Sequence, residues 1–302
     1  MKKGILEIRK DRRILFDGGM GTMLIDKGLP MGEPPEKWNL EHPEIVKQVH
    51  SSYFETGSDV VQTNTFGGNR AKLSTKGLDK DVRKINLMAA KLALEVTPSN
   101  KYVAGDIGPT GRFLKPMGDM TLEKLAEVFA EQAAALAKGG VDLISIETMY
   151  DLREAVAALK AAKKATNLPV FASITFNKGP KGFFTIMGDE VSTSMKTLED
   201  EGADVVGSNC TLGSGDMLEL VRLMRKSADL PIIAQPNAGQ PILKEGKTIY
   251  EQEPEDFAKD IRKMIEVGCN VVGGCCGTNP DFIKAMSEVM KEFNRQNSKV
   301  KI

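Results

Sequence analysis

The stretch VVGGCCGT, Val271 to Thr278, joins a short apolar run to glycines and two adjacent cysteines. A β-branched run that stops in glycine is typical of a buried β-strand followed by a turn. Neighbouring side chains on a regular strand point to opposite faces, but glycine frees the backbone to turn. We therefore expect a strand over Val271 to Gly273, with the thiols of Cys275 and Cys276 directed to one side just beyond its end.

A second run of similar design, VVGSNC, ends in Cys210. If both runs are parallel strands of one sheet, three thiols meet at the same edge. Zinc binds thiolates, and a site with three protein ligands keeps a fourth position open. Three other interpretations compete at this point: inert buried packing, a strained redox pair of neighbours, and a phosphate loop like those after the last strands of α/β barrels. No Lys or Arg lies between Val271 and Asp281 to favour the phosphate loop.

The whole chain alternates short apolar runs with amphipathic helical segments, which is the pattern of parallel β/α units. Strands buried on both faces are expected to be almost continuously apolar. Eight such runs predict an α/β fold, the (β/α)8 TIM barrel. The predicted strands are Ile14 to Asp17, Val60 to Thr63, Tyr102 to Gly105, Leu143 to Glu147, Val170 to Thr175, Val205 to Ser208, Ile232 to Gln235 and Val271 to Gly273.

Several helix boundaries can also be predicted. Pro43 suits the first turn of a helix that ends at Gly57. Thr121 suits the N-cap of another helix. Asp151, with Glu154 three residues later, resembles a capping box, in which each residue satisfies a backbone N–H of the other.

The composition and charge of the chain exclude several classes of function. The chain has 302 residues and a formal net charge of zero, so nothing suggests a nucleic-acid partner or an anionic membrane surface. No apolar stretch approaches membrane-spanning length. The four cysteines do not look like a disulfide framework, and the N-terminus lacks an apolar export signal, so we expect a reducing cytoplasm. No linker divides the chain, so we expect residues 1–302 to form one barrel domain, with residues 1–13 as a cap on its floor.

Polar residues gather at the predicted strand ends, where the loops of such barrels build active sites. Asp17 begins a glycine-rich turn, DGGMGT, whose backbone N–H groups suit a carboxylate. Gln62 and Glu147 end two further strands, and Asn237 follows a fourth. These residues therefore share one rim with the three cysteines.

Other reactive residue types lie away from this rim. Cys269 precedes the last predicted strand and so belongs to the opposite face, where it fills space. His42 and His50 lie on or beside the helix before the second strand, and neither is well placed as a ligand.

A zinc held by Cys210, Cys275 and Cys276 would carry net negative charge and would activate water poorly. It would suit a fourth sulfur ligand, because a coordinated thiol loses its proton yet stays nucleophilic. The residues thus predict thiol activation for alkyl transfer, with the three cysteines catalytic through the metal.

Seven stretches resemble the homocysteine S-methyltransferase family, most closely the N-terminal homocysteine-binding barrel of cobalamin-dependent methionine synthases. They follow one another along nearly the whole chain as DGGMGTML, NLEHPEIVKQVHSSYFETGSDVVQTNTFGGNR, GDIGPTGR, IETMYDLREA, GSNC, QPNAG and GGCCGTNP. The resemblance implies a zinc-dependent cytoplasmic methyltransferase of methionine biosynthesis that binds zinc through Cys210, Cys275 and Cys276. It also implies L-homocysteine as substrate.

The same resemblance implies that Asp17, Gly18 and Glu147 receive the amino-acid end of homocysteine. Acidic groups suit its ammonium, and glycine N–H groups suit its carboxylate. For Asn237 it suggests a substrate-binding position, with the amide oxygen as fourth zinc ligand until homocysteine arrives. A simple turn role after Pro236 is an equal alternative.

The chain departs from the family pattern at Gln62, where many methionine synthases carry Glu, which puts in doubt any hydrogen bond that needs a carboxylate there. The Asp-x-His-x-x-Gly signature of cobalamin binding is absent from the sequence. We therefore expect methylcobalamin on a separate corrinoid-carrying protein or module to supply the methyl group.

The sequence leaves open two other methyl donors and one other class of function. Betaine and S-methylmethionine enzymes share the zinc motif, and a betaine site needs an aromatic cage to which Trp38 and Tyr150 are candidate contributors. The alternative from another class is a non-catalytic zinc-binding or redox-sensing barrel.

Overall fold

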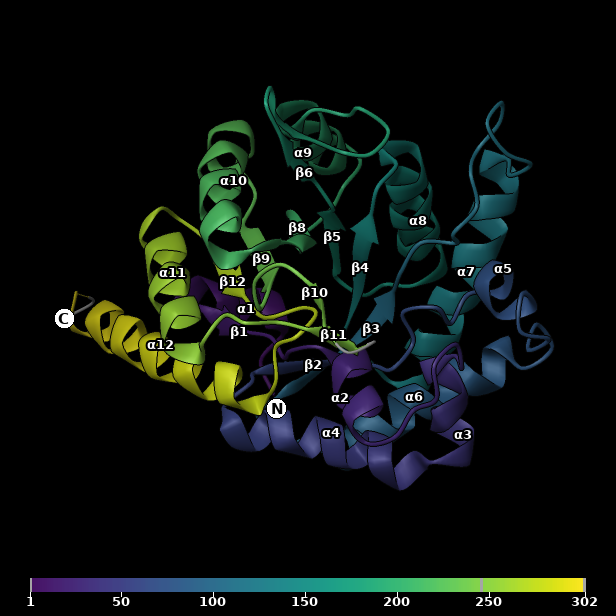
Figure 1. The fold of residues 1–302 in the computed structure, drawn as a ribbon, viewed down its shortest axis with the longest axis horizontal. Coiled ribbons are helices and arrows are strands. Elements are labelled where there is room, and N and C mark those ends of the chain that lie inside the picture. The colour runs from purple at the N-terminus through teal and green to yellow at the C-terminus, as the bar shows by residue number, and fades with distance from the viewer. Residues whose placement is uncertain (1, 245–246, 301–302) are drawn as a thin grey trace.

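In the residues that the computed structural model describes, 2–244 and 247–300, eight parallel strands form a barrel wall that helices cover from outside (Figure 1). The strands are β1 Ile14–Leu15, β2 Val60–Gln62, β3 Tyr102–Ile107, β4 Leu143–Met149, β5 Val170–Ile174, β8 Val205–Gly213, β9 Ile232–Asn237 and β12 Val271–Val272. Hydrogen-bonded neighbours follow the order β1-β12-β9-β8-β5-β4-β3-β2. Each predicted run is a strand, which confirms the predicted (β/α)8 architecture.

Most of the helices lie between these strands in sequence and pack outside them. The helices are α1 Ile5–Asp11, α2 Met20–Asp26, the 3-10 helix η1 Pro35–Lys37, α3 Trp38–Glu41, α4 Pro43–Thr56, α5 Arg70–Ser74, α6 Val82–Glu95, α7 Leu122–Gly139, α8 Leu152–Ala165, α9 Val191–Asp200, α10 Ser214–Ser227, α11 Pro254–Glu266 and α12 Pro280–Val300. Helix α12 follows the last strand, whereas α1 precedes the first strand and packs Ile5 against the cluster inside the barrel. None of the described helices is long and apolar enough to cross a membrane.

Most predicted helix boundaries are confirmed, but the predicted capping box is wrong. Pro43 begins α4, and Thr121 caps α7 by accepting a hydrogen bond from the Lys124 N–H. Asp151 does cap α8, through the N–H of Arg153. Glu154 does not reach back to it, because its buried carboxylate instead accepts hydrogen bonds from the N–H and hydroxyl of Thr110.

The inner face of the barrel changes from apolar to polar along the strands. Its lower part is one cluster of buried side chains, Ile14, Phe16, Val60, Tyr102, Ala104, Leu143, Phe171, Val205, Ile233 and Val271, with Ile5 of α1 packed among them. Because side chains alternate along a strand, the next inward positions are two residues further on. On β2, β3 and β4 the upper inward positions are Gln62, Asp106 and Glu147, so the top of the barrel carries the polar groups.

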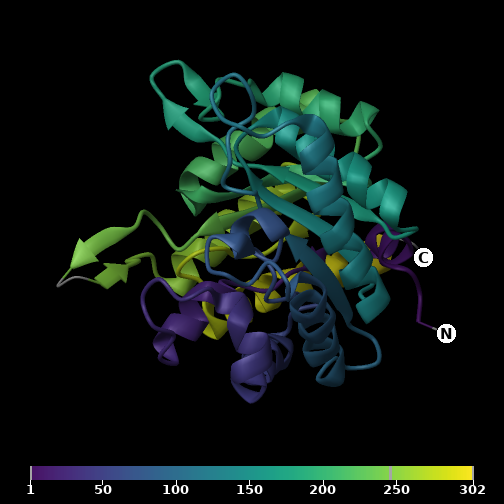
Figure 2. The same ribbon diagram turned by 90° about the vertical axis from the view of Figure 1, so that its right-hand side faces the viewer.

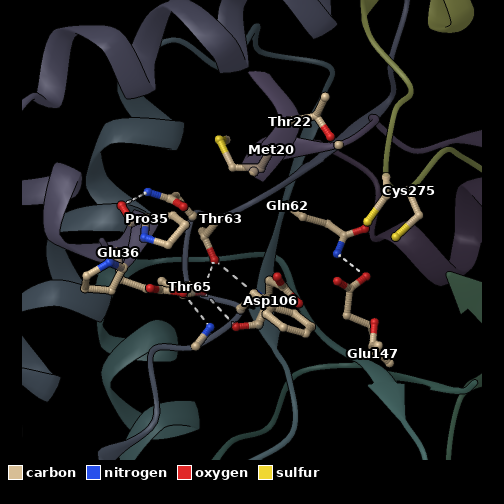
Figure 3. Close-up of a pocket in the computed structure, with 18 of the residues that line it drawn as sticks. Met20, Thr22, Pro35, Glu36, Gln62, Thr63, Thr65, Asp106, Glu147 and Cys275 are labelled. Atoms are coloured by element: carbon tan, nitrogen blue, oxygen red, sulfur yellow. Dashed lines mark hydrogen bonds between the residues drawn. The ribbon is translucent and has the colours of Figure 1, made fainter. Parts of the chain in front are cut away.

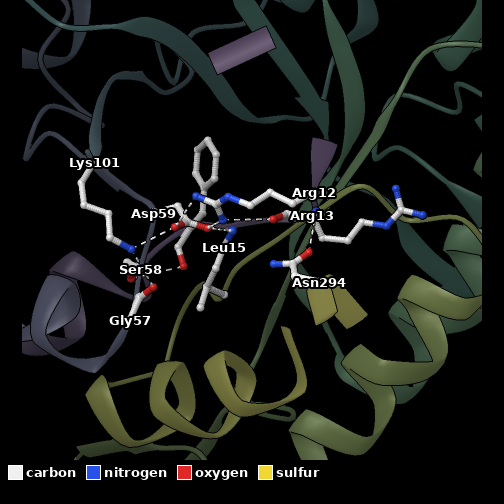
Figure 4. Close-up of polar contacts among 9 residues, drawn as sticks. Arg12, Arg13, Leu15, Gly57, Ser58, Asp59, Lys101 and Asn294 are labelled. Atoms are coloured by element: carbon white, nitrogen blue, oxygen red, sulfur yellow. Dashed lines mark hydrogen bonds and ion pairs between the residues drawn. The ribbon is translucent and has the colours of Figure 1, made fainter. Parts of the chain in front are cut away.

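The seam between β1 and β2 is closed by a side chain (Figure 4). The Asp59 N–H donates to the Leu15 carbonyl at 2.6 Å, and the Leu15 N–H donates to the Asp59 carboxylate at 3.1 Å. That carboxylate also accepts two hydrogen bonds from Arg12 and one from Lys101. One buried aspartate thus replaces part of the missing strand pairing.

Two short antiparallel hairpins within the described residues were not predicted. β6 Asn177–Gly179 pairs with β7 Gly182–Phe184, and β10 Ile242–Lys244 pairs with β11 Lys247–Ile249. Figure 2 shows the light-green hairpin β10–β11 projecting from the barrel rim. Both follow strand ends, where insertions do not disturb the barrel core.

Candidate metal centre and substrate cavity

The three predicted cysteines come together although Cys210 and Cys276 lie 66 residues apart in sequence. The Sγ atoms of Cys210, Cys275 and Cys276 lie within 4.8 Å of one another. Three sulfurs bound tetrahedrally at about 2.3 Å from zinc would lie about 3.8 Å apart. The Cys210 and Cys276 sulfurs are 3.9 Å apart. The donor set and its spacing therefore fit a three-thiolate zinc site.

Cys210 is aimed at the other two thiols by an irregularity in β8. The register against β9 shifts between Asn209 and Gly213, and Cys210 and Thr211 have φ values of 62° and 63°. A left-handed backbone at a non-glycine residue costs about 1–3 kcal/mol and is kept only where its surroundings enforce it. A bulge of this kind redirects a side chain. The strain thus falls at the residue whose sulfur must leave the regular strand direction.

Asn209 connects this bulge to the end of β4. Its amide oxygen accepts a hydrogen bond from the Thr148 N–H, and its amide nitrogen donates to the Thr148 hydroxyl, both at 2.7 Å. The same nitrogen lies 3.9 Å from the Cys275 sulfur. Thr148 is itself strained, with φ 57°. Sequence reasoning did not single out Asn209, although it stands next to Cys210 in the GSNC stretch.

The turn that carries Cys275 and Cys276 needs its glycines. A Cβ on Gly274 would lie 2.2 Å from the Thr278 hydroxyl oxygen, and Gly277 has φ +81°. The end of β9 holds the turn in place, because the Cys276 N–H donates to the Asn237 amide oxygen at 3.1 Å. Asn237 is thus adjacent to the metal centre, with its oxygen engaged by backbone.

The thiols of the cluster influence one another's ionisation. Hydrogen bonds from Cys210 and then Cys275 lower the pKa of Cys276 to about 3. Hydrogen bonds with Cys210 and Cys276, together with burial, raise the pKa of Cys275 well above its ordinary value. The pKa of Cys210 is raised to about 11, so in the absence of a metal the ionisation of one thiol disfavours that of the other two.

Tyr250, which sequence reasoning missed, closes one side of the cluster. Burial, followed by the nearby Cys276 thiol, raises the pKa of its hydroxyl. Its ring lies where a Cβ on Gly277 would come within 2.3 Å of it. It precedes α11 in an irregular segment without a periodic pattern, so only the tertiary structure brings it to the cysteines.

The cluster opens into a cavity of about 590 Å³ at the C-terminal end of the barrel. Figure 3 shows Cys275 at one end, Pro35 and Glu36 at the other, and Gln62, Asp106 and Glu147 between them. The glycine-rich turn at the start of α2 also lines this cavity, from Gly18 to Thr22. A small substrate can therefore contact the cysteines and the polar groups together.

Besides Glu36 at the far end, three buried carboxyl groups lie in or behind the middle of this cavity. Burial raises the pKa of Glu147 to about 7, against a hydrogen bond from Gln62 that lowers it. Burial, followed by the charges of Glu147 and Asp17, raises the pKa of Asp106 well above its ordinary value. Burial likewise raises the pKa of Asp17. Each ionised carboxylate makes the next harder to ionise, so the group as a whole favours a cationic ligand.

The predicted substrate residues take different positions. Gly18 and Glu147 line the cavity, and Asn237 lies beside Cys276. Asp17 is buried behind the wall, where its carboxylate accepts the Gln62 N–H at 2.8 Å across the β1–β2 seam. It is not among the described residues that line the cavity.

The residues predicted to lie outside the site do so. Cys269 is fully buried at the opposite end of β12, and its thiol contacts the carbonyl of Ile232. His50 is fully buried in α4, and the exposed His42 packs its ring on Trp38 at 4.6 Å between centroids. None of the three lines the described cavity.

A family model described as homocysteine S-methyltransferase matches residues 14–290. Two methionine synthases are among the relatives of known function. That of Mycobacterium leprae is 32% identical over 96% of this chain and 25% of its own length. That of Mycobacterium tuberculosis is 30% identical over 98% of this chain and 26% of its own. The chain thus spans about a quarter of the length of these relatives.

Solved structures support the same fold. The metallated form of the homocysteine methyltransferase MmuM from Escherichia coli superposes with a TM-score of 0.79, at 20% identity, over 94% of this chain and 98% of its own. Its apo form gives a TM-score of 0.75 at 21% identity, over 95% and 98% of the two chains. At this identity the likeness concerns the fold alone.

Proposed function

Because the chain belongs to the homocysteine S-methyltransferase family, we propose that it methylates the thiol of L-homocysteine to give methionine. The observation that carries the proposal is the placement of three mutually adjacent thiols at one end of a cavity whose middle is lined by buried carboxyl groups. This pairs a soft metal site with a site for an ammonium group. A substrate with a thiol at one end and an amino-acid group at the other matches both.

Cys210, Cys275 and Cys276 would hold zinc, which when bound supplies a Lewis acid that favours the thiolate form of a substrate sulfur. Their mutual distances support this assignment. Tyr250 and Asn209 would keep the cluster in place, since Tyr250 lies against it from the segment before α11 and Asn209 from β8.

The amino-acid end of homocysteine would lie toward Gly18 and Glu147. Glu147 is held by the Gln62 amide at 3.0 Å and keeps a carboxylate in the cavity wall for the ammonium. Backbone N–H groups in the first turn of α2 have no partner within the helix and suit the substrate carboxylate. Asp17 would act from behind the wall, and Asn237 would border the substrate sulfur.

The reaction would form a sulfur–methyl bond while the donor–methyl bond breaks and its electron pair stays with the donor. We propose methylcobalamin on a corrinoid-carrying protein or module as donor, because the relatives that match are methionine synthases about four times as long. A betaine site has less support: Trp38 is buried against His42, and neither it nor Tyr150 lines the described cavity. Three free thiols also suit a reducing cytoplasm.

The test combines zinc-loaded protein with L-homocysteine and, in separate reactions, methylcobalamin, betaine or S-methylmethionine. Methionine should form in the reaction with methylcobalamin, and the cofactor should lose its methyl group. Methionine formation should stop when a chelator removes the zinc. If the protein binds zinc and homocysteine but forms methionine only with betaine or S-methylmethionine, the proposed methyl donor is wrong and the proposed methyl acceptor stands. A zinc-loaded protein that binds no homocysteine would reject the function.

A further inference from the structure

We propose that Asp106 is a substrate-positioning residue that receives the α-ammonium group of homocysteine together with Glu147. The inference rests on the function proposed above and adds to it a residue that sequence reasoning left out. Asp106 lies at the C-terminal end of β3, two residues beyond Ala104, whose side chain belongs to the barrel interior. Its side chain therefore points inward at the level of the cavity, which it lines.

Asp106 has bonding capacity that the protein itself does not use. It is 5% exposed, and its Oδ1 atom has no hydrogen-bond partner among the described residues. Glu147 accepts from the Gln62 side chain and Asp17 from the Gln62 N–H. Burial raises the pKa of Asp106 and the Gln62 amide lowers it by a smaller amount, so the bonding capacity left over is that of the Oδ1 atom. A buried polar atom without a partner is unfavourable, so a ligand group that donates a hydrogen bond to it is favoured.

The atoms of this cavity wall that lack a hydrogen-bond partner are acceptors, and the hydrogen bonds that join Glu147, Gln62 and Gln235 explain why. The Glu147 carboxylate can only accept from Gln62, which fixes the Gln62 amide with its nitrogen toward Glu147. The Gln62 oxygen then accepts from the Gln235 nitrogen at 2.6 Å. This leaves the Gln235 oxygen facing away, buried and without a partner in the described structure.

Acceptors from three residues of one cavity suit a ligand group that donates several hydrogen bonds. Asp106, Glu147 and Gln235 all line the cavity. A primary ammonium carries three N–H donors and one positive charge, which also offsets the mutual repulsion of the carboxylates. A hydroxyl or an uncharged amide would donate fewer hydrogen bonds to these acceptors and would not offset the negative charge of the carboxylates. The geometry thus selects a thiol that bears an α-ammonium group.

The experiment compares L-homocysteine with 4-mercaptobutyrate, which has the same thiol and carboxylate but no amino group. Binding of each thiol to zinc-loaded wild type and to Asp106→Asn is measured by calorimetry, with zinc content and thermal unfolding recorded for both proteins. Asp119→Asn, which removes an exposed carboxylate from the loop after β3, is the matched control.

We expect Asp106→Asn to weaken L-homocysteine about tenfold or more, as for a lost hydrogen bond between charged groups. Binding of 4-mercaptobutyrate, zinc content and the control variant should change less than about twofold. The melting temperature should stay the same or rise, because the variant removes a buried carboxyl group without a partner.

Equal weakening of both thiols, unchanged homocysteine binding in the folded variant, or loss of fold or zinc would each overturn the role of Asp106. These results leave the proposed function intact as long as wild type binds homocysteine. Zinc-loaded wild type that binds neither thiol would instead reject the proposed function, and this inference with it.

Discussion

The Gln62 side-chain nitrogen donates a 3.0 Å hydrogen bond to Glu147 Oε2, and this contact links the ends of β2 and β4 inside the cavity. Many methionine synthases carry Glu at the position of Gln62. Here the Gln62 amide donates to Glu147, so this contact does not need a carboxylate at residue 62. Burial raises the pKa of Glu147 to about 7, and the Gln62 hydrogen bond offsets part of this shift by favouring the charged form.

Replacing Glu147 by Gln should weaken homocysteine binding by about 1.5–3 kcal/mol while zinc content is unchanged, because the carboxylate faces the ammonium rather than the metal. Titration calorimetry on zinc-loaded protein measures it. Glu36→Gln is the matched control, since Glu36 is a buried carboxyl at the other end of the same cavity. Parallel loss of zinc in Glu147→Gln would place Glu147 among the metal ligands.

Alanine at Cys210, Cys275 or Cys276 should remove most of the zinc and the activity, because two thiolates cannot replace a three-thiolate site. Cys269→Ala should keep both, since that thiol is buried at the other end of the barrel. Metal analysis of the four purified variants provides the comparison. Wild-type zinc content and affinity in Cys275→Ala would rule out the site.

Homocysteine binding to the zinc-loaded protein should release close to one proton near neutral pH. The free substrate is mostly a protonated thiol, and coordination favours the thiolate by several pK units. Affinity should therefore rise with pH until the bound thiol is fully ionised. Calorimetry in buffers of different ionisation enthalpy counts the proton. Homocysteine bound without proton release at pH 7 would exclude a metal-bound thiolate.

His50 should make the fold acid-sensitive independently of the metal centre. Burial lowers its pKa from 6.5 to about 4, and neither ring nitrogen has a hydrogen-bond partner in the described structure. Between these values the unfolded chain binds a proton that the folded chain does not. The free energy of unfolding should therefore fall as the pH drops from 6.5 to 4, by up to about 3 kcal/mol.

His50→Leu should abolish this component of acid sensitivity, whereas His42→Leu, at an exposed position, should leave it in place. Urea unfolding at several pH values between 4 and 7 measures both. Identical pH dependence in His50→Leu and wild type would show that another group is responsible.

Asp59→Asn should destabilise the fold by about 3 kcal/mol, because it leaves Arg12 and Lys101 without their shared carboxylate at the β1–β2 seam. Asp256→Asn breaks an exposed pair with Lys259 and should leave the free energy of unfolding almost unchanged. Chemical denaturation of the two variants tests the difference. Equal stability would mean that the seam does not depend on the ion pairs.

Much of the architecture was readable from local patterns. The predicted strands appear because a parallel strand buried on both faces must be apolar along its length, and this needs no knowledge of its neighbours. Cys275 and Cys276 were recognisable from the glycines that surround them. The two hairpins were missed, since they lie in loops that the barrel core does not constrain.

The sequence by itself determined the barrel, the strand ends that carry the thiols, and the residues at which backbone turns must occur, because each follows from hydrophobic periodicity or from the conformational freedom of glycine. Only the tertiary structure decided which carboxyl groups face the substrate. Asp17 and Asp106 look alike in the sequence, as acidic residues near strand ends. Asp17 is engaged at the seam by the Gln62 N–H, whereas Asp106 lines the cavity and has one carboxylate oxygen without a hydrogen-bond partner in the described structure. That difference depends on contacts between β1, β2 and β3, and such long-range hydrogen bonds leave no mark on the local sequence pattern.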